Sequence, residues 1–325
     1  MRHITSRSSH WLAALVAMGL ATPALAAYPE KPITLIVPWA AGGGTDATAR
    51  IIAKAPEEEL GETINVVNRT GGSGVVGHTA IARAKPDGYT LGLGTVEINM
   101  MHWQGLTDLT YEDFTPIGQI NFDAASLSVA EDTDYQDLDD LMSAVREAPA
   151  GTFNASGTGL GGIWHVALVG LLMDLDMPAD KVNWVPSQGA APAMTELAAG
   201  GVDMAATSLP EARSMIDAGR VRSLGVMAEE PLESFPDVPT VASQVDSDFT
   251  TGAWRGVIGP QGMDDAIVET LESALHDAYQ SETYQSFMEK QGYGVQWRDA
   301  QAFGTYMEES DAAFGDIMKA IGLAK

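Results

Sequence analysis

Two segments of the sequence match the spacing Gly-x-Gly-x-x-Gly, in which glycines let a backbone approach the phosphates of a dinucleotide. The first motif consists of Gly72, Gly74 and Gly77, and the second consists of Gly157, Gly159 and Gly162. Glu97, about 20 residues beyond the first motif, stands where an acid that binds a ribose hydroxyl is expected. This spacing raises the hypothesis of an NAD-dependent oxidoreductase that uses the loop Gly72–Gly77.

Three observations weaken that hypothesis. Three residues separate the preceding apolar run, 64–68, from Gly72, and the helix predicted after the loop is short. The chain is also predicted to be exported, where free nicotinamide cofactor is not normally met. The glycines are better explained as tight turns at which the backbone comes close to a ligand, so no cofactor is expected.

Other residues with catalytic chemistry lack the spacing that catalysis or metal binding needs. The sequence has no cysteine, no Gly-x-Ser-x-Gly turn and no phosphate-binding Gly-x-x-x-x-Gly-Lys loop. The histidines outside the amino terminus are far apart: His78, His102, His165 and His276. His165, near the start of an apolar helix, fits a cleft residue and a core residue equally well. We therefore expect no metal site and no enzyme.

What remains is a set of loops rich in glycine and hydroxyl side chains, each of which opens a predicted helix. They are residues 40–46, 70–77, 156–162 and 187–191. The backbone N–H groups and the dipole at a helix amino terminus attract anions without a buried cation. Several such loops around one cleft would hold a carboxylate, although each of them could also be a structural turn.

The charge of the chain restricts its partners. Lys and Arg number 18 and Asp and Glu number 44, which gives a formal charge of −26. Binding to nucleic acid needs clustered basic residues, so it is not expected. An excess of carboxylates is typical of proteins from salty habitats, that is, of an acidic proteome; an ordinary acidic exported protein is the alternative.

The amino terminus has the order of a secretory signal. Arg2 and Arg7 precede an apolar run over 11–21, and Ala24-Leu25-Ala26 supplies small residues for cleavage before Ala27. A membrane anchor would need about 18 apolar residues, more than this run contains. Residues 1–26 are therefore predicted to be a signal peptide, and the mature protein is predicted to be periplasmic.

Apolar runs and helical patterns alternate along the rest of the chain, which favours mostly parallel α/β sheets covered on both faces. Strands are expected at 33–38, 64–68, 89–95, 151–155, 182–186, 202–207, 221–228 and 254–259. Helices are expected at 47–55, 75–84, 138–146, 163–175, 192–199, 210–218, 264–279, 282–291 and 300–321. The pattern predicts two lobes, lobe I from 27–124 plus 251–325 and lobe II from 125–250, with ligand at the carboxyl ends of the strands.

Short motifs distributed from Tyr28 to the carboxyl terminus resemble the substrate-binding proteins of tripartite tricarboxylate transporters, also called the Bug family. In the first part they are Tyr28-Pro29-Glu30-Lys31-Pro32-Ile33, Val37-Pro38, Gly42-Gly43-Gly44-Thr45-Asp46, Asn68-Arg69 and Lys85-Pro86-Asp87-Gly88-Tyr89-Thr90-Leu91. Further along they are Gly189-Ala190-Ala191-Pro192-Ala193, Gly200-Gly201-Val202-Asp203, Ala218-Gly219-Arg220-Val221-Arg222, Phe235-Pro236-Asp237-Val238-Pro239-Thr240 and Trp254 with Gly256 and Pro260.

The resemblance implies a monomeric periplasmic solute receptor with a type II-like binding-protein fold. Such a receptor closes its two lobes on a small organic acid and delivers it to a permease of one large and one small membrane subunit. A receptor that serves a sensor kinase remains an alternative. Tricarboxylates, dicarboxylates, aromatic acids and amino acids all remain open as ligands.

The resemblance also implies which residues contact the ligand. By position these are Trp39, Ala40, Ala41, Gly43, Gly44, Thr45, Asp46, Thr95, Val96, Ser156, Gly157, Thr158, Gly159, His165, Ser187, Gly189, Thr207 and Ser208.

The chain departs from the usual family pattern at several of these loops. Ser187-Gln188 replaces a common Tyr-Lys, and Thr207-Ser208 replaces a common Asp-Asn. Glu97 stands where an uncharged residue is usual. Arg255 follows Trp254 in a predicted hinge strand, where it either contacts a ligand carboxylate or forms a hinge salt bridge.

Overall fold

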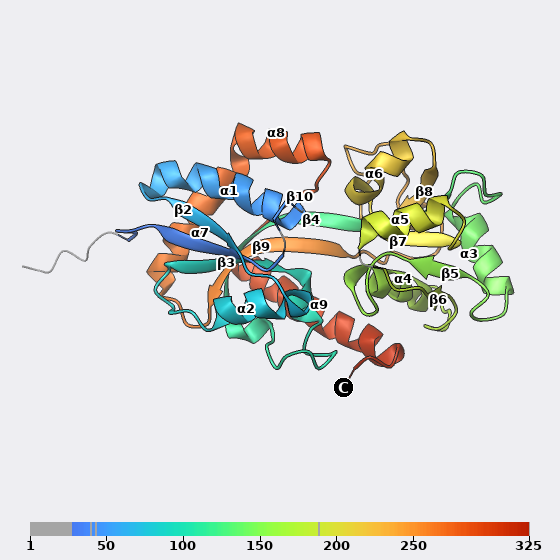
Figure 1. Cartoon of the computed structure of the whole chain (residues 1–325), viewed down its shortest axis with the longest axis horizontal. Coiled ribbons are helices and arrows are strands. Elements are labelled where there is room, and N and C mark those ends of the chain that lie inside the picture. Colours follow the sequence, from blue (N-terminus) through green and yellow to red (C-terminus); the bar gives the residue numbers. More distant parts are fainter. Residues whose placement is uncertain (1–27, 40, 43, 188, 325) are drawn as a thin grey trace, which may run out of the picture.

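The computed structural model describes residues 28–39, 41–42, 44–187 and 189–324. Two lobes, each a sheet with helices around it, are joined by two long strands (Figure 1). The strand β4 (Phe114–Ala130) carries the chain from one lobe to the other, and β9 (Gly252–Pro260) returns antiparallel beside it. The predicted signal, 1–26, lies outside the described residues.

Lobe I is the half of the molecule built on the strands β2-β1-β3-β9-β4, in that order across the sheet. The strands β1 (Ile33–Val37), β2 (Ile64–Asn68) and β3 (Thr90–Thr95) are parallel, and β10 (Val295–Asp299) pairs with β4. Alternate side chains of β1 enter separate cores, because successive strand residues point to opposite faces. The sheet is therefore covered on both sides.

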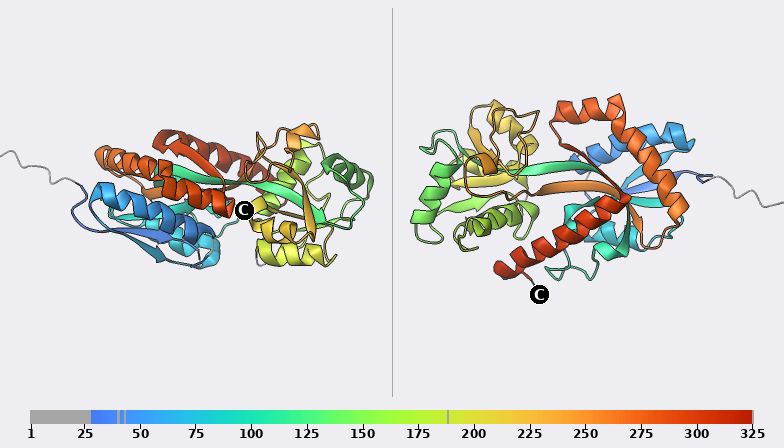
Figure 2. Two further views of the ribbon diagram at one scale, coloured as in Figure 1. Left: turned by 90° about the horizontal axis from the view of Figure 1, so that it is seen from above. Right: turned by 180° about the vertical axis from the view of Figure 1, so that it is seen from behind.

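Helices α1 (Gly44–Leu60), α7 (Asp265–Gln280) and α8 (Glu282–Gln291) pack on one face of this sheet. Helices α2 (Val75–Ala82) and α9 (Ala300–Ala320) pack on the other. The long helix α9 extends from lobe I toward lobe II (Figure 2). Its continuation reaches lobe II, because a Cβ at Gly161 would lie 2.8 Å from Leu323 Cδ1.

Lobe II continues the sheet in the order β4-β7-β5-β6, with β8 (Val221–Val226) on β4. The strands β5 (Asn154–Ser156), β6 (Asn183–Trp184) and β7 (Met204–Ser208) are parallel to one another, and both β7 and β8 are antiparallel to β4. The helices are α3 (Leu138–Glu147), α4 (Ile163–Asp174), α5 (Ala190–Ala198) and α6 (Leu209–Asp217). Helix α4 is apolar all round and lies inside the lobe, as such a helix must.

Short 3-10 turns complete the described secondary structure: η1 (Gly72–Gly74), η2 (Val96–Asn99), η3 (Tyr111–Asp113) and η4 (Val241–Ser243). Within the described residues, no helix has both the length and the apolar character that crossing a membrane requires.

The α/β fold class is confirmed, with one addition: the strands at the centre of the molecule are antiparallel. Strand β4 and strand β10 were not expected from the sequence. The chain crosses between the lobes in β4 and β9, whereas the residue limits given above for each lobe stay a prediction.

The glycine-rich loop before α1 is held by Asp46, in the first turn of that helix. The Asp46 carboxylate accepts hydrogen bonds from the backbone N–H of Gly42 at 2.9 Å, from Asn68 Nδ2 at 2.8 Å and from Arg50 Nη2 at 3.0 Å. The bond from Arg50 is the main reason why the pKa of Asp46 is lowered to about 2. Asp46 thus ties Gly42, in the loop before α1, to the first turn of that helix.

We predict that Asp46→Asn lowers the free energy of unfolding by about 1–2 kcal/mol at pH 7. The folded-state pKa of Asp46 is below its ordinary value of 3.8, so its contribution is complete above about pH 4. It is lost as the pH falls toward 2, and the difference in melting temperature between wild type and variant should shrink over that range. Asp132→Asn, at an exposed turn, is the control. A difference that stays constant from pH 6 to pH 2 would contradict the prediction.

Candidate functional site

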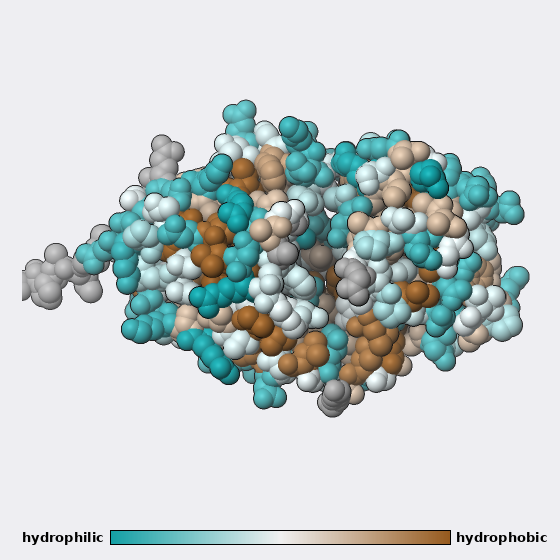
Figure 3. Space-filling model, in the orientation of Figure 1, coloured by the Kyte–Doolittle hydropathy of each residue, from teal (hydrophilic) through white to brown (hydrophobic). Residues whose placement is uncertain are grey.

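A cleft of about 780 Å³ lies between the two lobes. The space-filling view shows the molecule hollowed between the lobes, with apolar side chains on both sides of the lower part (Figure 3). The described residues that line the cleft are Trp39, Gly44, Thr45, Ser73, Thr95, Val96, Glu97, Met100, Met101, Gln104, Leu106, Asp123, Thr158, Gly159, Leu160, Gly161, Gly162, Ile163, Trp164, Ser187, Gly189, Ala190, Glu211, Ala253, Trp254, Arg255 and Tyr293.

Three helices begin at the cleft. The first residues of α1, α4 and α5, namely Gly44, Ile163 and Ala190, all line it. The first backbone N–H groups of a helix have no partner within the helix, and the helix dipole places partial positive charge there. The cleft therefore receives anion-attracting groups from both lobes.

Two polar side chains in the cleft wall have no hydrogen-bond partner among the described residues. They are Trp254, whose Nε1 is buried, and Thr158, whose Oγ1 is buried. Trp254 is 0 % exposed, and its ring packs edge-on against Phe303 with centroids 5.2 Å apart. A buried donor without a partner is costly, so these groups are suited to a ligand that carries acceptor oxygens.

A buried ion pair ties the two crossing strands together at the cleft. Arg255 Nη1 on β9 lies 2.6 Å from Asp123 Oδ2 on β4 and also donates to Asn121 Oδ1. Arg255 Nε donates to Thr45 Oγ1 at 3.0 Å. Burial lowers the pKa of Arg255, but the carboxylates of Asp123 and Glu211 outweigh this effect and raise it. The hinge salt bridge considered from the sequence is therefore present, and contact between Arg255 and a ligand stays a prediction.

Two further carboxylates face the cleft. Glu97 in η2 accepts a hydrogen bond from Thr95 Oγ1 at 2.5 Å, and burial raises its pKa although Thr95 and Arg255 oppose this. Glu211 belongs to the capping box of α6 with Ser208, and its side chain is open to the cleft. The pKa of Glu211 is raised, mainly because surrounding protein atoms desolvate its carboxylate. The negative charge of Asp123 adds to this increase, and the positive charge of Arg255 opposes it.

Two buried histidines support the glycine loops from behind. His165 Nδ1 accepts a hydrogen bond from the backbone N–H of Gly161 at 3.1 Å, and its ring stacks on Trp184 at 4.7 Å. His78 Nδ1 lies 2.9 Å from the carbonyl oxygen of Gly74. Burial lowers the pKa of both histidines to about 4, so both are neutral at pH 7. Of the two readings of His165, the structure supports the core residue.

The structure brings ten of the residues predicted from the sequence to the cleft wall. They are Trp39, Gly44, Thr45, Thr95, Val96, Thr158, Gly159, Ser187, Gly189 and Arg255. Ala40 and Gly43 lie outside the described residues.

The other predicted residues do not line the cleft. Asp46 holds its own loop, and Ser156 Oγ donates to the carbonyl oxygen of Val185 at 2.8 Å. Thr207 is 0 % exposed, and Ser208 is buried beneath the start of α6. The remaining three are Ala41, Gly157 and His165. None of these seven residues is part of the cavity lining, and Ala41 is exposed at the surface.

Sequence reasoning missed several lining residues as ligand contacts, among them Trp254, Asp123, Glu211 and Tyr293. Asp123 had a signal: the polar residues Gln119, Asn121 and Asp123 recur at every second position of the sequence, and all three are buried in β4, although a register shift separates Gln119 from Asn121. A period of two among polar residues predicts a strand whose polar face meets polar partners. Glu211 had only the spacing of a helix capping box with Ser208.

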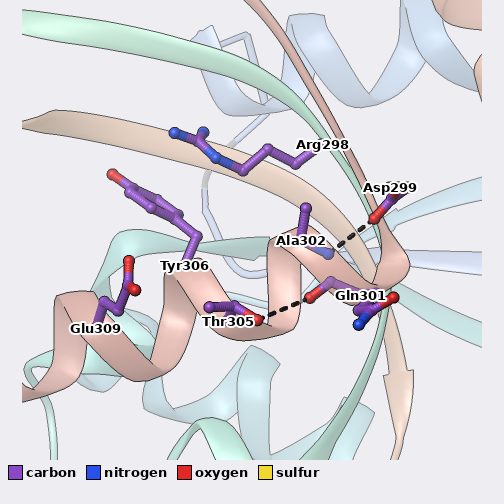
Figure 4. Close-up of a pocket in the computed structure, with 7 residues that line it drawn as sticks. All are labelled: Arg298, Asp299, Gln301, Ala302, Thr305, Tyr306 and Glu309. Carbon is purple, nitrogen blue, oxygen red and sulfur yellow. Dashed lines mark hydrogen bonds between the residues drawn. The ribbon is translucent and has the colours of Figure 1, made fainter.

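A second, shallower cavity of about 380 Å³ lies where β10 meets α9 (Figure 4). Asp299 caps α9 by accepting a hydrogen bond from Ala302 N at 2.7 Å, and Arg298 lies over the ring of Tyr306 at 4.0 Å. Helix capping and packing account for these side chains. No group of three or more His, Cys, Asp or Glu side chains in the described ranges is placed to hold a metal ion.

A cleft between two α/β lobes joined by two crossing strands, lined by helix amino termini, defines the class of two-lobed solute-binding proteins. Residues 48–323 match the model of the tripartite tricarboxylate transporter family receptor. The chain belongs to this receptor family, and the family is one of substrate-binding proteins and not of enzymes.

Two curated relatives illustrate the similarity. A UPF0065 protein in the tcbD-tcbE intergenic region of Pseudomonas sp. (strain P51) is 33% identical over 257 residues, 78% of this chain and 75% of the relative. Protein BugT of Bordetella pertussis is 29% identical over 294 residues, 86% of this chain and 88% of the relative.

Solved structures agree with the described fold. A TctC solute-binding protein from Polaromonas has a TM-score of 0.80 at 30% identity, covering 90% of this chain and 99% of its own. A Rhodopseudomonas palustris protein with adipate has a TM-score of 0.76 at 26% identity, covering 91% and 99%. MatC from the same organism, with bound malate, has a TM-score of 0.73 at 26% identity, covering 89% and 99%.

The oxidoreductase hypothesis is wrong, because the family is a receptor family. The glycines that suggested it have structural roles. The loop follows β2, at the edge of the sheet, and a Cβ at Gly77 would lie 2.5 Å from Pro38 Cα. Close packing of backbone on backbone requires a glycine there.

The second glycine motif yields a stability prediction. A Cβ at Gly157 would lie 2.3 Å from the carbonyl oxygen of Ala206, whereas a Cβ at Gly159 would meet nothing within 4 Å. We therefore expect Gly157→Ala to lower the free energy of unfolding by about 1–3 kcal/mol, since the backbone must shift. Gly159→Ala, the matched control, should change it by less than about 0.5 kcal/mol. Chemical denaturation of the two variants measures the difference, and equal midpoints would refute the packing argument.

Proposed function

We propose that the protein is a periplasmic receptor that captures a small organic acid in the cleft and delivers it to a permease of one large and one small membrane subunit. The observation that carries the proposal is the set of donors that faces one cleft from both lobes. Helix amino termini at Gly44, Ile163 and Ala190 join the unpartnered groups of Trp254 and Thr158. Carboxylate oxygens are the acceptors that such donors bind best.

The similar Rhodopseudomonas palustris structures, with malate and with adipate, support a carboxylate as the ligand class. We further propose that the protein is exported through a cleaved signal over 1–26 and acts as a monomer. The amino-terminal pattern of two arginines, an apolar run and small residues supports export.

The mechanism needs no chemical step. A carboxylate that accepts hydrogen bonds from Thr45 in lobe I and from Thr158 in lobe II gains both sets only when the lobes are close together. Its binding therefore shifts the population of conformations toward the closed form. The closed surface, which both lobes contribute, is what a permease recognises in this proposal.

The ligand class is tested by thermal unfolding of residues 27–325 with citrate, malate, adipate, benzoate and glutamate, and with NAD as the negative control. High salt is used because these residues carry a formal charge of −28, the −26 of the full chain without Arg2 and Arg7. A ligand at one hundred times its dissociation constant adds about 2.7 kcal/mol to the stability. We expect stabilisation by at least one acid and none by NAD. Stabilisation by NAD alone would overturn the proposal, and so would failure of every acid in this panel together with aspartate, leucine, phenylalanine and their analogues without the amino group.

Trp254→Phe tests the donor argument directly. The change keeps an aromatic ring beside Phe303 but removes Nε1, so we expect the affinity for the acid to fall by about ten-fold. Trp297→Phe, in β10 and outside the cleft lining, is the control and should leave the affinity unchanged. Isothermal titration calorimetry measures the affinity of both variants. An unchanged affinity in the Trp254 variant would show that Nε1 does not contact the ligand.

Delivery to a permease, as opposed to a sensor kinase, needs a cellular measurement. Deletion of the gene should abolish uptake of the radiolabelled acid, and a plasmid copy should restore it. If deletion left uptake intact and abolished only a transcriptional response to the acid, the sensor alternative would replace the transport proposal.

A further inference from the structure

We propose that the solute is zwitterionic: an organic acid that also carries an ammonium group, which lies against the carboxylate of Glu97. This inference rests on the proposed function, since it adds a second group to the acid that the cleft would hold. Its argument adds the charged side chains of the cleft to the donors considered above.

The charged residues in the cleft wall do not suit a bare anion. Among the described lining residues the charged side chains are Glu97, Asp123, Glu211 and Arg255. With all four ionised, their sum is +1 − 3 = −2. A ligand that brought only negative charge would be repelled at this end of the cleft.

Arg255 does not remove that repulsion, because it is already bound. Its Nη1 contacts Asp123 and Asn121, and its Nε donates to Thr45. Its ion pair is with Asp123; it forms no salt bridge with Glu97 or Glu211, although its charge lowers the pKa of both. Glu97 and Glu211 are therefore left without a positive partner among the described lining residues.

The surroundings of Glu97 contain no other cation to neutralise it. Thr95 on β3 donates to it, Arg255 on β9 is paired with Asp123, and His78 behind Thr95 is neutral at pH 7. The other titratable groups of this region, Glu211 and Tyr293, are acids. Burial raises the pKa of Glu97, which means that Thr95 and Arg255 do not fully compensate its ionised form. An ammonium group would supply the remaining compensation.

An observation separate from these charges points to a ligand in the same cavity. Trp254 is fully buried, lines the cleft, and has an Nε1 without a partner in the described part of the chain. That N–H calls for an acceptor oxygen, which an ammonium group cannot offer. The cleft thus presents donors for a carboxylate and acids for a cation, and a zwitterion has both groups. A metal ion fits less well, since the described residues hold no cluster of three or more metal-ligating side chains.

The test compares acids that differ only in the amino group. Calorimetry with the mature protein at pH 7.5 would use L-aspartate and succinate, L-glutamate and glutarate, L-leucine and 4-methylpentanoate, and L-phenylalanine and 3-phenylpropionate. In at least one pair we expect the amino acid to bind ten-fold or more tightly than its partner. Equal or tighter binding of the partner in every pair overturns the zwitterion inference and leaves the proposed acid receptor standing. Failure of all eight acids overturns the zwitterion inference, and if citrate, malate, adipate and benzoate also fail, the acid receptor falls with it.

Glu97→Gln then identifies the group that meets the ammonium. The variant keeps an oxygen that can accept from Thr95 but removes the charge, so the affinity for the amino acid should fall ten-fold or more. Glu269→Gln, on the exposed side of α7, is the matched control and should bind as the wild type does. Melting temperatures of the ligand-free variants check that both are folded.

The pH dependence gives a second readout of opposite sign for the two possible roles of Glu97. An ionised Glu97 that binds ammonium requires loss of its proton, so the affinity should rise with pH and the rise should vanish in Glu97→Gln. A protonated Glu97 that donates to a second ligand carboxylate would give an affinity that falls with pH, and Glu97→Gln would retain binding. That second result would overturn the inference.

Discussion

The ion pair between Arg255 and Asp123 is the interaction on which the arrangement of the cleft depends. It joins β9 to β4, the two strands by which the chain passes between the lobes, and Arg255 also reaches Thr45 at the start of α1. Loss of one partner from a buried pair leaves an uncompensated charge, which costs far more than the pair contributes as a whole. Arg255 and Asp123 both line the cleft, and their ion pair links the start of α1 to the two crossing strands β4 and β9.

The sequence predicted most of the elements that surround this hinge, and missed the hinge strand β4 itself. Helices such as α8 and α9 have a clear apolar period, and glycines mark their ends. Strand β4 contains Pro116 and Gly118, and its middle is polar at Gln119, Asn121 and Asp123. Those polar side chains are buried because Arg255, Arg298 and backbone groups satisfy them. A strand that is stabilised by partners distant in sequence does not show the apolar alternation of an ordinary one.

The sequence was enough to predict which loops form the candidate site, but not which of their side chains face the cleft. A glycine-rich loop before a helix forms whatever the remainder of the chain does, so the loops at 156–162 and 187–191 could be read locally. Whether a side chain faces the cleft depends on how the strand before it is rotated, and a shift of one residue reverses its direction. Thr158 and Ser187 face the cavity, whereas Ser156 and Thr207 point into lobe II.

The end of α9 has a consequence for how closure could be observed. Leu323, beyond a helix that starts in lobe I, lies against Gly161 in the loop of lobe II that lines the cleft, and Gln104 Nε2 donates to the carbonyl oxygen of Gly161 at 3.2 Å. Any rotation of one lobe against the other changes the environment of this segment. The fluorescence of a dye attached there would change when the lobes move. The protein is therefore a suitable scaffold for a reagentless fluorescent sensor of its own solute.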